Sequence, residues 1–511
     1  MSLDASNHHS SGCLSLRRLF KLGSERTSKS SSKQANASHK YGQTLKPSDS
    51  ERDVDITDMS SRVFYDTCCN FACSKTNVAT YQWEAPPVYS TLSCHDSNRD
   101  KVRCTIESVV DELDSSLRSL SLKIHSHPEL MFEETYAHNL LSDFMENHGF
   151  FVTRHYLGLE TAFRAEYTYG KGGRTLGINS EMDALPVIGH ACGHNLIAIS
   201  GVGMALAIKS ALETHKVPGK VVLLGTPGTA FDLSTTRVTH FSLSGEEGGG
   251  GKIILLDRGA YKGMDTCLMC HPSPGPEFSS SVPSSLAMQS LDAEFFGQSA
   301  HAGDAPWEGT NALDAAFLAY SGVAVLRQQI KPDHRVHGVI QGSEKRAANV
   351  IPDYAKMRWY VRAPTRDQLA QLVERVCACF EGAALATSCR LNVTKSTPYY
   401  DLRQNSVLAG AFSQAISEES GMTVGLYPSG ASTDFGNVSY GKFLPSLHPA
   451  FAIPTQPNGG NHSPAFTDSA RTTEAHAACM IITKALACTG FRVLEDGDFS
   501  RQVREAFDAS L

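Results

Sequence analysis

The sequence predicts an α/β fold: a mostly parallel sheet with crossover helices, interrupted by a small ferredoxin-like layer of order βαββαβ. Three observations support this prediction. Short apolar runs alternate with helical patterns from about residue 106 onward. Between residues 285 and 398 the order changes to that of a small two-layer domain. A dense group of Asp, His and Cys residues, within 181–194, occupies a strand-to-helix turn, where α/β sheets keep their functional sites.

The first 95 residues form a Ser-rich leader that the composition predicts to be disordered. Its first 50 residues hold 13 Ser, 8 Lys or Arg and only 3 Asp or Glu, with little apolar periodicity. Arg17 and Arg18 would suit a mitochondrial presequence, but Asp4 and Glu25 interrupt its acid-poor pattern. We therefore expect a cytoplasmic protein, with a mitochondrial location as the minor alternative.

The overall composition is that of a large globular chain. Its 511 residues are 41% apolar and 8% aromatic, which is enough to bury an extensive core. The net charge of −7 and the lack of a basic stripe disfavour nucleic-acid binding. No apolar stretch approaches the roughly 18 to 20 residues that cross a bilayer. The 14 cysteines are scattered and no secretory signal precedes them, so we expect reduced thiols in an intracellular compartment.

The first folded segment, residues 106–284, alternates helices with strands. Apolar residues at helical spacing predict helices over Ile106–Ile124 and Thr135–His148, and a longer helix after His194. Strands are predicted at 175–178, 220–224, 252–256 and 267–269. This alternation is typical of parallel strands joined by crossover helices.

The inserted layer, residues 285–398, is predicted as strand 286–296, helix 311–329, strand 335–342, strand 354–362, helix 366–387 and strand 390–394. From residue 399 to 490 the first pattern resumes, with a further polar set that includes Asp434, His448 and His462. The final helix is predicted over Asp468–Thr489, and residues 491–511 form a predicted C-terminal tail.

Cys192 and His194 are potential metal ligands separated by one residue. A thiolate and an imidazole two positions apart can grip one ion if the backbone turns sharply between them, which Gly193 permits. The competing interpretation is a buried thiol beside a core histidine. For so short a motif this second interpretation is favoured unless further ligands are found.

Adjacent carboxylates occur in Gly245-Glu246-Glu247-Gly248, a glycine-rich turn between predicted strands. Neighbouring side chains on an extended chain point in different directions, so one glutamate can bind a metal while the other is a general base on a metal-bound water. A solvated acidic loop is the alternative. A phosphate-binding loop is excluded, because no Ser or Thr follows Lys252 and two carboxylates would repel phosphate.

Two histidines complete the candidate ligand set. His271 ends the apolar run 267–270, at the carboxyl end of a predicted strand, and His462 lies in a Gly-Asn-His-Ser-Pro motif. Each alone is typical of an ordinary polar residue. Together with Cys192, His194 and Glu247 they would supply enough nitrogen, sulfur and oxygen ligands for a two-metal hydrolytic centre at one sheet edge.

Five motifs occur in order between residues 106 and 490. They are Asp183-Ala-Leu-Pro with His190-Ala-Cys-Gly-His-Asn, Gly225-Thr-Pro, Glu246-Glu-Gly-Gly-Gly-Gly-Lys, His271-Pro, and Gly297-Gln-Ser-Ala-His-Ala. In these motifs the chain resembles the amidohydrolase branch of peptidase family M20, the aminoacylase and carboxypeptidase metallopeptidases, and also aminobenzoyl-glutamate hydrolases. The resemblance is specific for the family and not for the substrate.

The resemblance implies a zinc-peptidase-like catalytic domain with two divalent metals, and an inserted domain through which two copies form a homodimer. By position it implies five metal ligands: Cys192, His194, Glu247, His271 and His462. It also implies that Glu246 is the general base and that Asp183 orients the metal-binding groups.

The same resemblance assigns roles within the inserted layer. His301 would stabilise the developing oxyanion, while Asn349 and Arg362 would hold the substrate. A guanidinium can clamp a substrate carboxylate with two hydrogen bonds, and an imidazole can donate to a tetrahedral oxygen. For Asn349 and Arg362 the alternative is an ordinary polar surface position.

One segment departs from the family pattern. Members run from Gly-Thr-Pro directly into a short Ala-Glu-Glu turn, whereas here the 17 residues 228–244 separate Pro227 from Gly245. They correspond to 51 nucleotides, and their Gly-Thr start and Ser-Gly end suit intron borders. The hypotheses are a retained intron and a genuine surface loop, whose closure entropy costs only about 0.6 kcal/mol per doubling of length.

These observations predict a metal-dependent amidohydrolase that cleaves a small N-acyl amino acid or dipeptide with a free carboxylate. The alternatives are a non-catalytic metal-binding scaffold and a carboxypeptidase that acts on longer peptides. Thiolate and imidazole ligands favour zinc, while carboxylate-containing two-metal sites also accept manganese, cobalt or nickel. The expected partners are the small substrate and a second copy of the chain, without nucleic acid or membrane.

Overall fold

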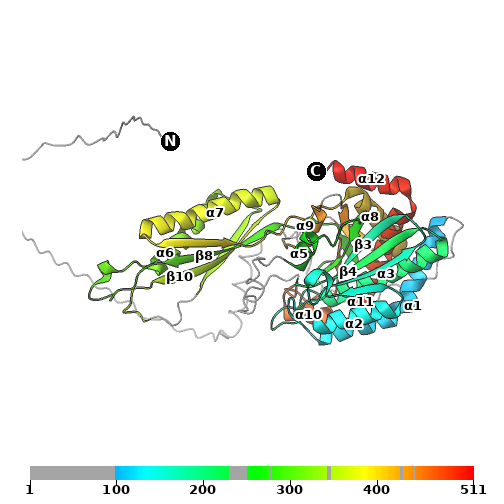
Figure 1. Ribbon diagram of the computed structural model, residues 1–511, viewed down its shortest axis with the longest axis horizontal. Helices are drawn as coiled ribbons and strands as arrows, with labels where there is room; N and C mark the ends of the chain where they lie inside the picture. Colours follow the sequence, from blue (N-terminus) through cyan, green and yellow to red (C-terminus); the bar gives the residue numbers. More distant parts are fainter. Residues whose placement is uncertain are drawn as a thin grey trace, which may run out of the picture. The chain divides into compact units, whose positions relative to one another are not determined.

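The computed structural model describes residues 98–228, 250–276, 278–341, 347–425, 430–441 and 444–510 (Figure 1). The predicted leader, residues 1–95, lies outside the described residues. The paired glutamates Glu246 and Glu247 also lie outside them, as does the segment 228–244 apart from Gly228.

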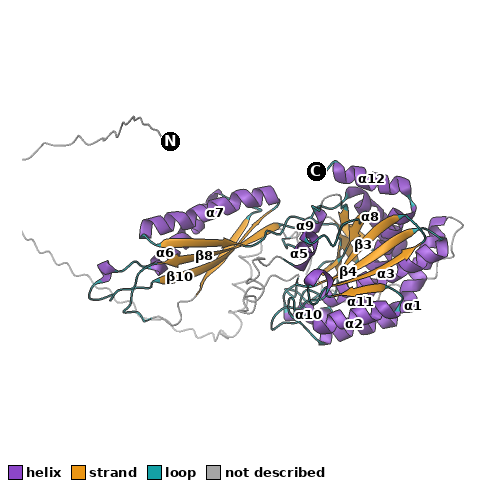
Figure 2. Ribbon diagram, viewed as in Figure 1, coloured by secondary structure: helices purple, strands orange, loops and turns teal. Residues whose placement is uncertain are grey.

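A six-stranded sheet organises the larger part of the fold (Figure 2). Its strands lie in the order β1 (Phe151–Arg154), β2 (Phe163–Tyr169), β4 (Gly219–Thr226), β3 (Arg174–Glu181), β5 (Thr266–Leu268) and β13 (Ser446–Leu447). The last four are parallel, and β1 and β2 form an antiparallel edge. This confirms the predicted mostly parallel sheet. The residues that follow the four parallel strands gather at one edge.

Helices cover both faces of this sheet. One apolar core joins β3 and β4 to α1 (Asn98–Ser126), α2 (Thr135–Asn147), α3 (His194–His215), α8 (Ser406–Ser420) and α11 (Thr473–Glu495), and includes Val221 and Leu223. A second core includes Val222 and Leu224 with α5 (Gly251–Asp257) and α9 (Phe435–Ser439). Because successive strand residues face opposite sides, the two cores lie on opposite faces of the sheet.

Two of the described helices, α3 and α11, are candidates for a membrane span by their sequence. By length and composition alone, both are long and apolar enough to cross a membrane. However, 89% of the apolar window of α3 and 72% of that of α11 is buried inside the structure. Their apolar surface is therefore used in packing, as expected of helices that are hydrophobic on most sides.

A second, smaller sheet adjoins the carboxyl edge of the first. Its order is β12 (Thr423–Gly425), β7 (Ser279–Ser281), β14 (Ala450–Ala452) and β6 (His271–Ser273). β6 follows β5 along the chain, and β14 follows β13. β6 and β14 pair in parallel, with Ala450 opposite His271. The short sheet therefore lies just beyond the edge of the main sheet that carries the candidate ligands.

The inserted layer has the predicted order. It contains β8 (Ala287–Phe296), η4 (Pro306–Glu308), α6 (Ala312–Leu326), η5 (Arg327–Gln329), β9 (Arg335–Gln341), β10 (Tyr354–Ala363), α7 (Arg366–Thr387) and β11 (Arg390–Lys395). The strands form an antiparallel sheet of order β11-β8-β10-β9, with α6 and α7 packed around Phe295, Trp359 and Phe380. The ferredoxin-like prediction is confirmed.

Three predicted elements are wrong. Residues 252–256 form the helix α5 and not a strand, because a run of five residues is too short for its period to separate the two. The chain breaks between α10 (Pro464–Ser469) and α11, whose first turn is capped by Thr472. The predicted tail is also helical: α11 continues to Glu495, and α12 (Gly497–Asp508) buries Phe499, Val503 and Phe507 at helical spacing.

The expectation of reduced thiols holds for most of the described cysteines. Eight of them, including Cys192, are free. Cys104, in α1, is disulfide-bonded, which contradicts the expectation at this position. Cysteine count and spacing in a long chain do not exclude a single bridge.

Candidate metal centre

A cavity of about 1000 Å³ opens at the carboxyl edge of the main sheet. Its wall includes Cys192, His194, His271, His462 and Arg362. These residues come from four separate motifs of the sequence and from both the main fold and the inserted layer. The fold therefore brings together most of the described residues that the sequence singled out.

Cys192 is the common neighbour of the histidines. One ligand atom each from Cys192, His194 and His271 lies within 4.8 Å of the others. Cys192 Sγ is 3.4 Å from His271 Nε2 and 3.6 Å from His462 Nε2. The described members of the predicted ligand set thus form one group, with the thiol between two imidazoles.

Backbone geometry places Cys192 and His462 in this group. Gly193 adopts a left-handed conformation (φ 75°) at the N-cap of α3, and a Cβ atom there would lie 2.5 Å from Pro272 Cγ. His462 is also left-handed (φ 68°), and its N–H donates to the carbonyl of Ala191 (2.8 Å). A non-glycine residue at positive φ is strained and is held there only by its surroundings.

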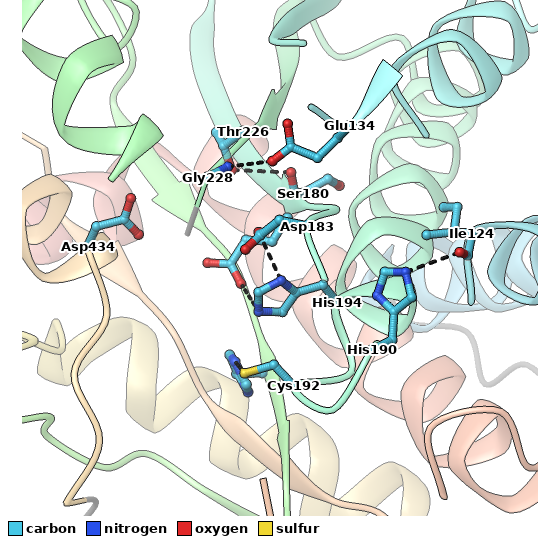
Figure 3. A network of polar contacts seen from close by, with 12 residues as sticks. Ile124, Glu134, Ser180, Asp183, His190, Cys192, His194, Thr226, Gly228 and Asp434 are labelled. Carbon is cyan, nitrogen blue, oxygen red and sulfur yellow. Dashed lines mark hydrogen bonds and ion pairs between the residues drawn. The ribbon is translucent and has the colours of Figure 1, made fainter. Parts of the chain in front are cut away.

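Hydrogen bonds at Nδ1 orient two of the histidines, and Figure 3 shows the one between His194 and Asp183. His194 Nδ1 lies 3.0 Å from Asp183 Oδ1, and His271 Nδ1 lies 2.7 Å from the carbonyl oxygen of Pro272. If each Nδ1 carries the donated proton, Nε2 is left as the ligand atom, which is the usual arrangement of metal-binding histidines. Asp183 therefore occupies the orienting position that was predicted for it.

Opposite charges set the protonation of this group. Burial alone would raise the pKa of the Cys192 thiol, but the charges of His271 and His194 hold that pKa well below its usual range. Burial alone would lower the pKa of His194, but Asp183, Cys192 and Glu181 raise it well above its usual value. A thiolate beside imidazolium groups fits a metal site, because a divalent cation binds in exchange for such protons.

Three buried charged residues lie beside the Cys192 and histidine group, and the sequence analysis did not predict them as site residues. Lys252 Nζ lies 2.6 Å from Glu181 Oε1 and 2.7 Å from Asp434 Oδ1, and all three side chains are buried. The backbone N–H of Lys252 also donates to Asp434 Oδ2 (3.1 Å). Glu181 stands two residues before Asp183 at a strand end, so strand alternation was the signal that could have identified it.

Glu134 is another buried carboxyl group that the sequence analysis missed. Its Oε1 accepts the N–H of Gly228 (2.7 Å; Figure 3), and its Oε2 accepts the hydroxyl of Thr161 (2.6 Å). Burial, aided by the charge of Asp183, raises the pKa of Glu134 to about 8. Glu134 therefore fixes the chain where β4 ends.

The residues just before and just after residues 229–249 contact each other. The N–H of Gly251 donates to the carbonyl of Gly228 (3.2 Å), and a Cβ atom at Gly251 would lie 2.0 Å from the carbonyl oxygen of Pro227. Such close backbone approach requires glycine at 251. The described ends of the segment are thus joined directly, next to Glu134.

His448, which follows β13, stacks on His271 with ring centroids 6.1 Å apart. Among the described residues, neither of its ring nitrogens has a hydrogen-bond partner. Burial, reinforced by the charge of His271, lowers the pKa of His448 to about 3. A neutral imidazole therefore forms part of the cavity wall beside the candidate ligands.

The inserted layer contributes only one of its three predicted residues to this cavity. Arg362, near the end of β10, donates to Ser432 Oγ (2.9 Å). His301 and Asn349 are exposed and lie together, with the N–H of Ala302 donating to the carbonyl of Asn349 (2.9 Å). In the β-sheet register Arg362 pairs with Met288, near the start of β8. Phe296, at the other end of β8, is about 27 Å from Met288 along the strand, and His301 lies beyond it.

An α/β sheet with a Cys/His group at its carboxyl edge, an orienting carboxylate and an inserted layer defines a metallohydrolase. Residues 287–387 match the family description "Peptidase dimerisation domain". The chain is 38% identical over 421 residues to the Xaa-Arg dipeptidase of Mus musculus, an alignment that covers 79% of this chain and 91% of the relative. It belongs to peptidase family M20, as the motifs predicted.

Two further comparisons agree with this assignment. The chain is 30% identical over 314 residues to a p-aminobenzoyl-glutamate hydrolase of Escherichia coli K12, covering 58% of this chain and 60% of the relative. Its fold matches a dinuclear metal-binding peptidase of the M20 family from Bacillus subtilis, with a TM-score of 0.57, 18% identity, and coverage of 75% and 99% of the two chains. The predicted fold class and the prediction of an amidohydrolase are confirmed.

Proposed function

We propose that this chain cleaves the amide bond of a dipeptide or a small N-acyl amino acid with two divalent metals. The metals would be held by Cys192, His194, Glu247, His271 and His462. The observation that carries the proposal is the position of Cys192 Sγ, 3.4 Å from His271 Nε2 and 3.6 Å from His462 Nε2. These separations suit ions with bonds of about 2.3 Å to sulfur and about 2.0 Å to nitrogen.

Thiolate and imidazole donors favour zinc, and manganese, cobalt and nickel are the alternatives for a site that also contains a carboxylate. When bound, two such ions would polarise the substrate carbonyl and lower the pKa of a water molecule. Glu246 would take the proton of that water and pass it to the leaving nitrogen. Asp183 holds His194 in the orientation that presents Nε2.

Arg362 supports a substrate with a free carboxylate. It lines the same cavity as the candidate metal ligands, and its guanidinium is fixed by Ser432. A guanidinium can clamp a carboxylate through two parallel hydrogen bonds. Because a relative of 38% identity is an Xaa-Arg dipeptidase, we propose dipeptides with a C-terminal basic residue as the first substrates, followed by p-aminobenzoyl-glutamate.

The exposed apolar residues of the inserted layer support a homodimer. Trp307, Phe317, Val325, Val339 and Leu385 are each more than half exposed. Large exposed apolar residues gathered on one layer are typical of an interaction surface. Since His301 and Asn349 lie at the far end of the inserted sheet from Arg362, we propose that they serve the cavity of the second copy.

The test is hydrolysis by the wild-type chain and by Glu246→Gln. A panel of Xaa-Arg dipeptides, N-acyl amino acids and a longer peptide is incubated with metal-loaded protein. We expect hydrolysis of at least one small substrate, with the rate lowered by at least about a hundredfold in Glu246→Gln and metal content unchanged. Glu112→Gln, which neutralises an exposed glutamate of α1, is the matched control and should retain activity.

Two results would overturn the proposal. A chain that binds metal but hydrolyses nothing in the panel is the non-catalytic scaffold. Hydrolysis confined to the longer peptide identifies a carboxypeptidase instead of a dipeptidase. Activity that survives Glu246→Gln would remove Glu246 as the general base.

A further inference from the structure

We propose that Glu181 is a further ligand of the metal held by His194 and His271. This inference deepens the proposed function and rests on it. The resemblance to the family placed five ligands by motif, and Glu181 is not among them. Its assignment comes from the geometry at the end of β3.

Glu181 is the last residue of β3, and its carboxylate faces the ligand atom of His194. Oε2 lies 3.2 Å from His194 Nε2, and the side chain of Glu181 is 1% exposed. Nδ1 of the same imidazole is engaged by Asp183, so Nε2 is the atom left for a metal. Two donor atoms bonded to one tetrahedral zinc at about 2.0 to 2.2 Å are separated by about 3.4 Å. The observed separation therefore suits an ion bound by both residues.

The other carboxylate oxygen fixes this orientation. Glu181 Oε1 pairs with Lys252 Nζ at 2.6 Å, and the side chain of Lys252 is fully buried. Lys252 is in turn held by Asp434, through Nζ (2.7 Å) and through its backbone N–H (3.1 Å). With one oxygen committed to a rigid ammonium group, the second oxygen points consistently at His194.

Charge balance argues against a role of Glu181 as the counter-ion of Lys252 alone. Asp434 already neutralises that ammonium group, so Glu181 adds a buried negative charge that needs a second cation. A metal ion bound at His194 would supply that cation.

The donor count also supports the assignment. Cys192 Sγ and the imidazoles of His194 and His271 form one group, with Glu181 beside it in the same cavity wall. Glu181 would bring the number of protein donor atoms at this ion to four. Zinc can expand to five-coordinate, which leaves a position at this ion for a water molecule or a substrate atom.

Glu181→Gln and Asp434→Asn form a matched pair for the test. Each removes one buried carboxylate from Lys252 and keeps the size of the side chain, but only Glu181 faces His194. Metal-free full-length proteins are titrated with cobalt(II) in competition with a chelator, while the visible spectrum is recorded. Thermal unfolding of the metal-free proteins reports the loss of the ion pair.

We expect the wild-type chain to bind about two cobalt ions. Glu181→Gln should weaken one of them by roughly 10- to 100-fold and change the intensity of its visible bands, because the donor set changes. Asp434→Asn should lower thermal stability to a similar degree and leave both affinities within about threefold of wild type. If Glu181→Gln does not fold, Glu181→Asp keeps the charge for Lys252 while shortening the reach by about 1.5 Å, and should weaken the same ion.

Equal cobalt affinities and spectra for Glu181→Gln and wild type would overturn this inference. If that protein still binds two ions and hydrolyses its substrate, the proposed function stands without Glu181 as a ligand. A wild-type chain that binds no cobalt would overturn both. A comparable loss of cobalt affinity in Asp434→Asn would also overturn the assignment. It would show that the loss comes from disturbing the ion pairs around Lys252 and not from removing a ligand.

Discussion

Arg362 and His301 lie at opposite ends of the inserted sheet. Arg362 pairs with Met288 at the start of β8, and His301 follows Phe296 at its end. Met288 and Phe296 are about 27 Å apart along the strand, so we expect that one cavity does not use both Arg362 and His301 of the same chain. A cavity completed by the second copy of a twofold dimer removes this difficulty.

Subunit complementation tests this relationship. Glu246→Gln and His301→Ala chains, carrying different tags, are expressed together and the mixed dimers are isolated. If His301 serves the opposite cavity, one of the two cavities has both groups intact, and the mixed dimers should show about half of the wild-type rate. Mixed dimers as inactive as their parents would place both residues in one cavity.

Deletion of residues 228–244 leaves a glycine directly after Pro227, as in the full chain. Deletion brings Gly245 into the place of Gly228, whose N–H binds Glu134 and whose carbonyl binds Gly251. We therefore expect the shortened chain to fold, to bind metal and to hydrolyse substrate at least as fast as the full chain. Transcript sequencing across codons 227–246 decides between the two hypotheses, since a message that lacks 51 nucleotides supports the retained intron. A shortened chain that loses metal binding would contradict this account.

Lys252 should be far more important for stability than a partly exposed lysine. Lys252→Met leaves Asp434 as a buried carboxylate without its cation and takes from Glu181 one of its two partners, a change that costs about 3 to 5 kcal/mol. Lys484→Met removes a pair with the exposed Asp111 and should cost at most about 1 kcal/mol. Urea unfolding of the two variants makes the comparison, and similar losses would show that the buried network is not stabilising.

Glu134 should make stability fall as pH rises. Its pKa is raised to about 8 in the folded protein, so the folded state retains a proton that the unfolded state releases near the ordinary value of 4.5. Its contribution is complete below about pH 4.5 and is lost as pH rises toward 8, at up to about 1.4 kcal/mol per pH unit. Glu134→Gln should therefore gain stability relative to wild type between pH 5 and pH 8. Urea unfolding at both pH values measures this, and a constant difference would contradict the shift.

Much of the fold follows from patterns that are local in the sequence. The inserted layer was predicted element by element, because strand alternation and two capped helices, after Asn311 and Thr365, mark it clearly. The strand predicted at 252–256 is a helix, because a run of five residues is too short for its period to separate the two, and Lys252 contacts Asp434, a residue 182 positions away. No local pattern contains that contact.

The candidate site, too, could be predicted only where its residues belong to local sequence patterns. Cys192, His194, His271 and His462 carry recognisable motifs, and the fold brings them together. Lys252 and Glu134 act through buried contacts between distant segments, so local patterns did not identify them as site residues, whereas strand alternation before Asp183 was a signal for Glu181. The roles of Glu246 and Glu247, the metal identity and the cytoplasmic location stay predictions.

The most direct test of the central claim is a zinc titration of metal-free protein while hydrolysis of an Xaa-Arg dipeptide is followed. We predict that the rate rises with metal content and saturates at about two zinc ions per chain. Cys192→Ala should prevent both the binding and the rise. Full hydrolysis by metal-free protein, or two bound zinc ions without hydrolysis in both the full and the shortened chain, would contradict the account.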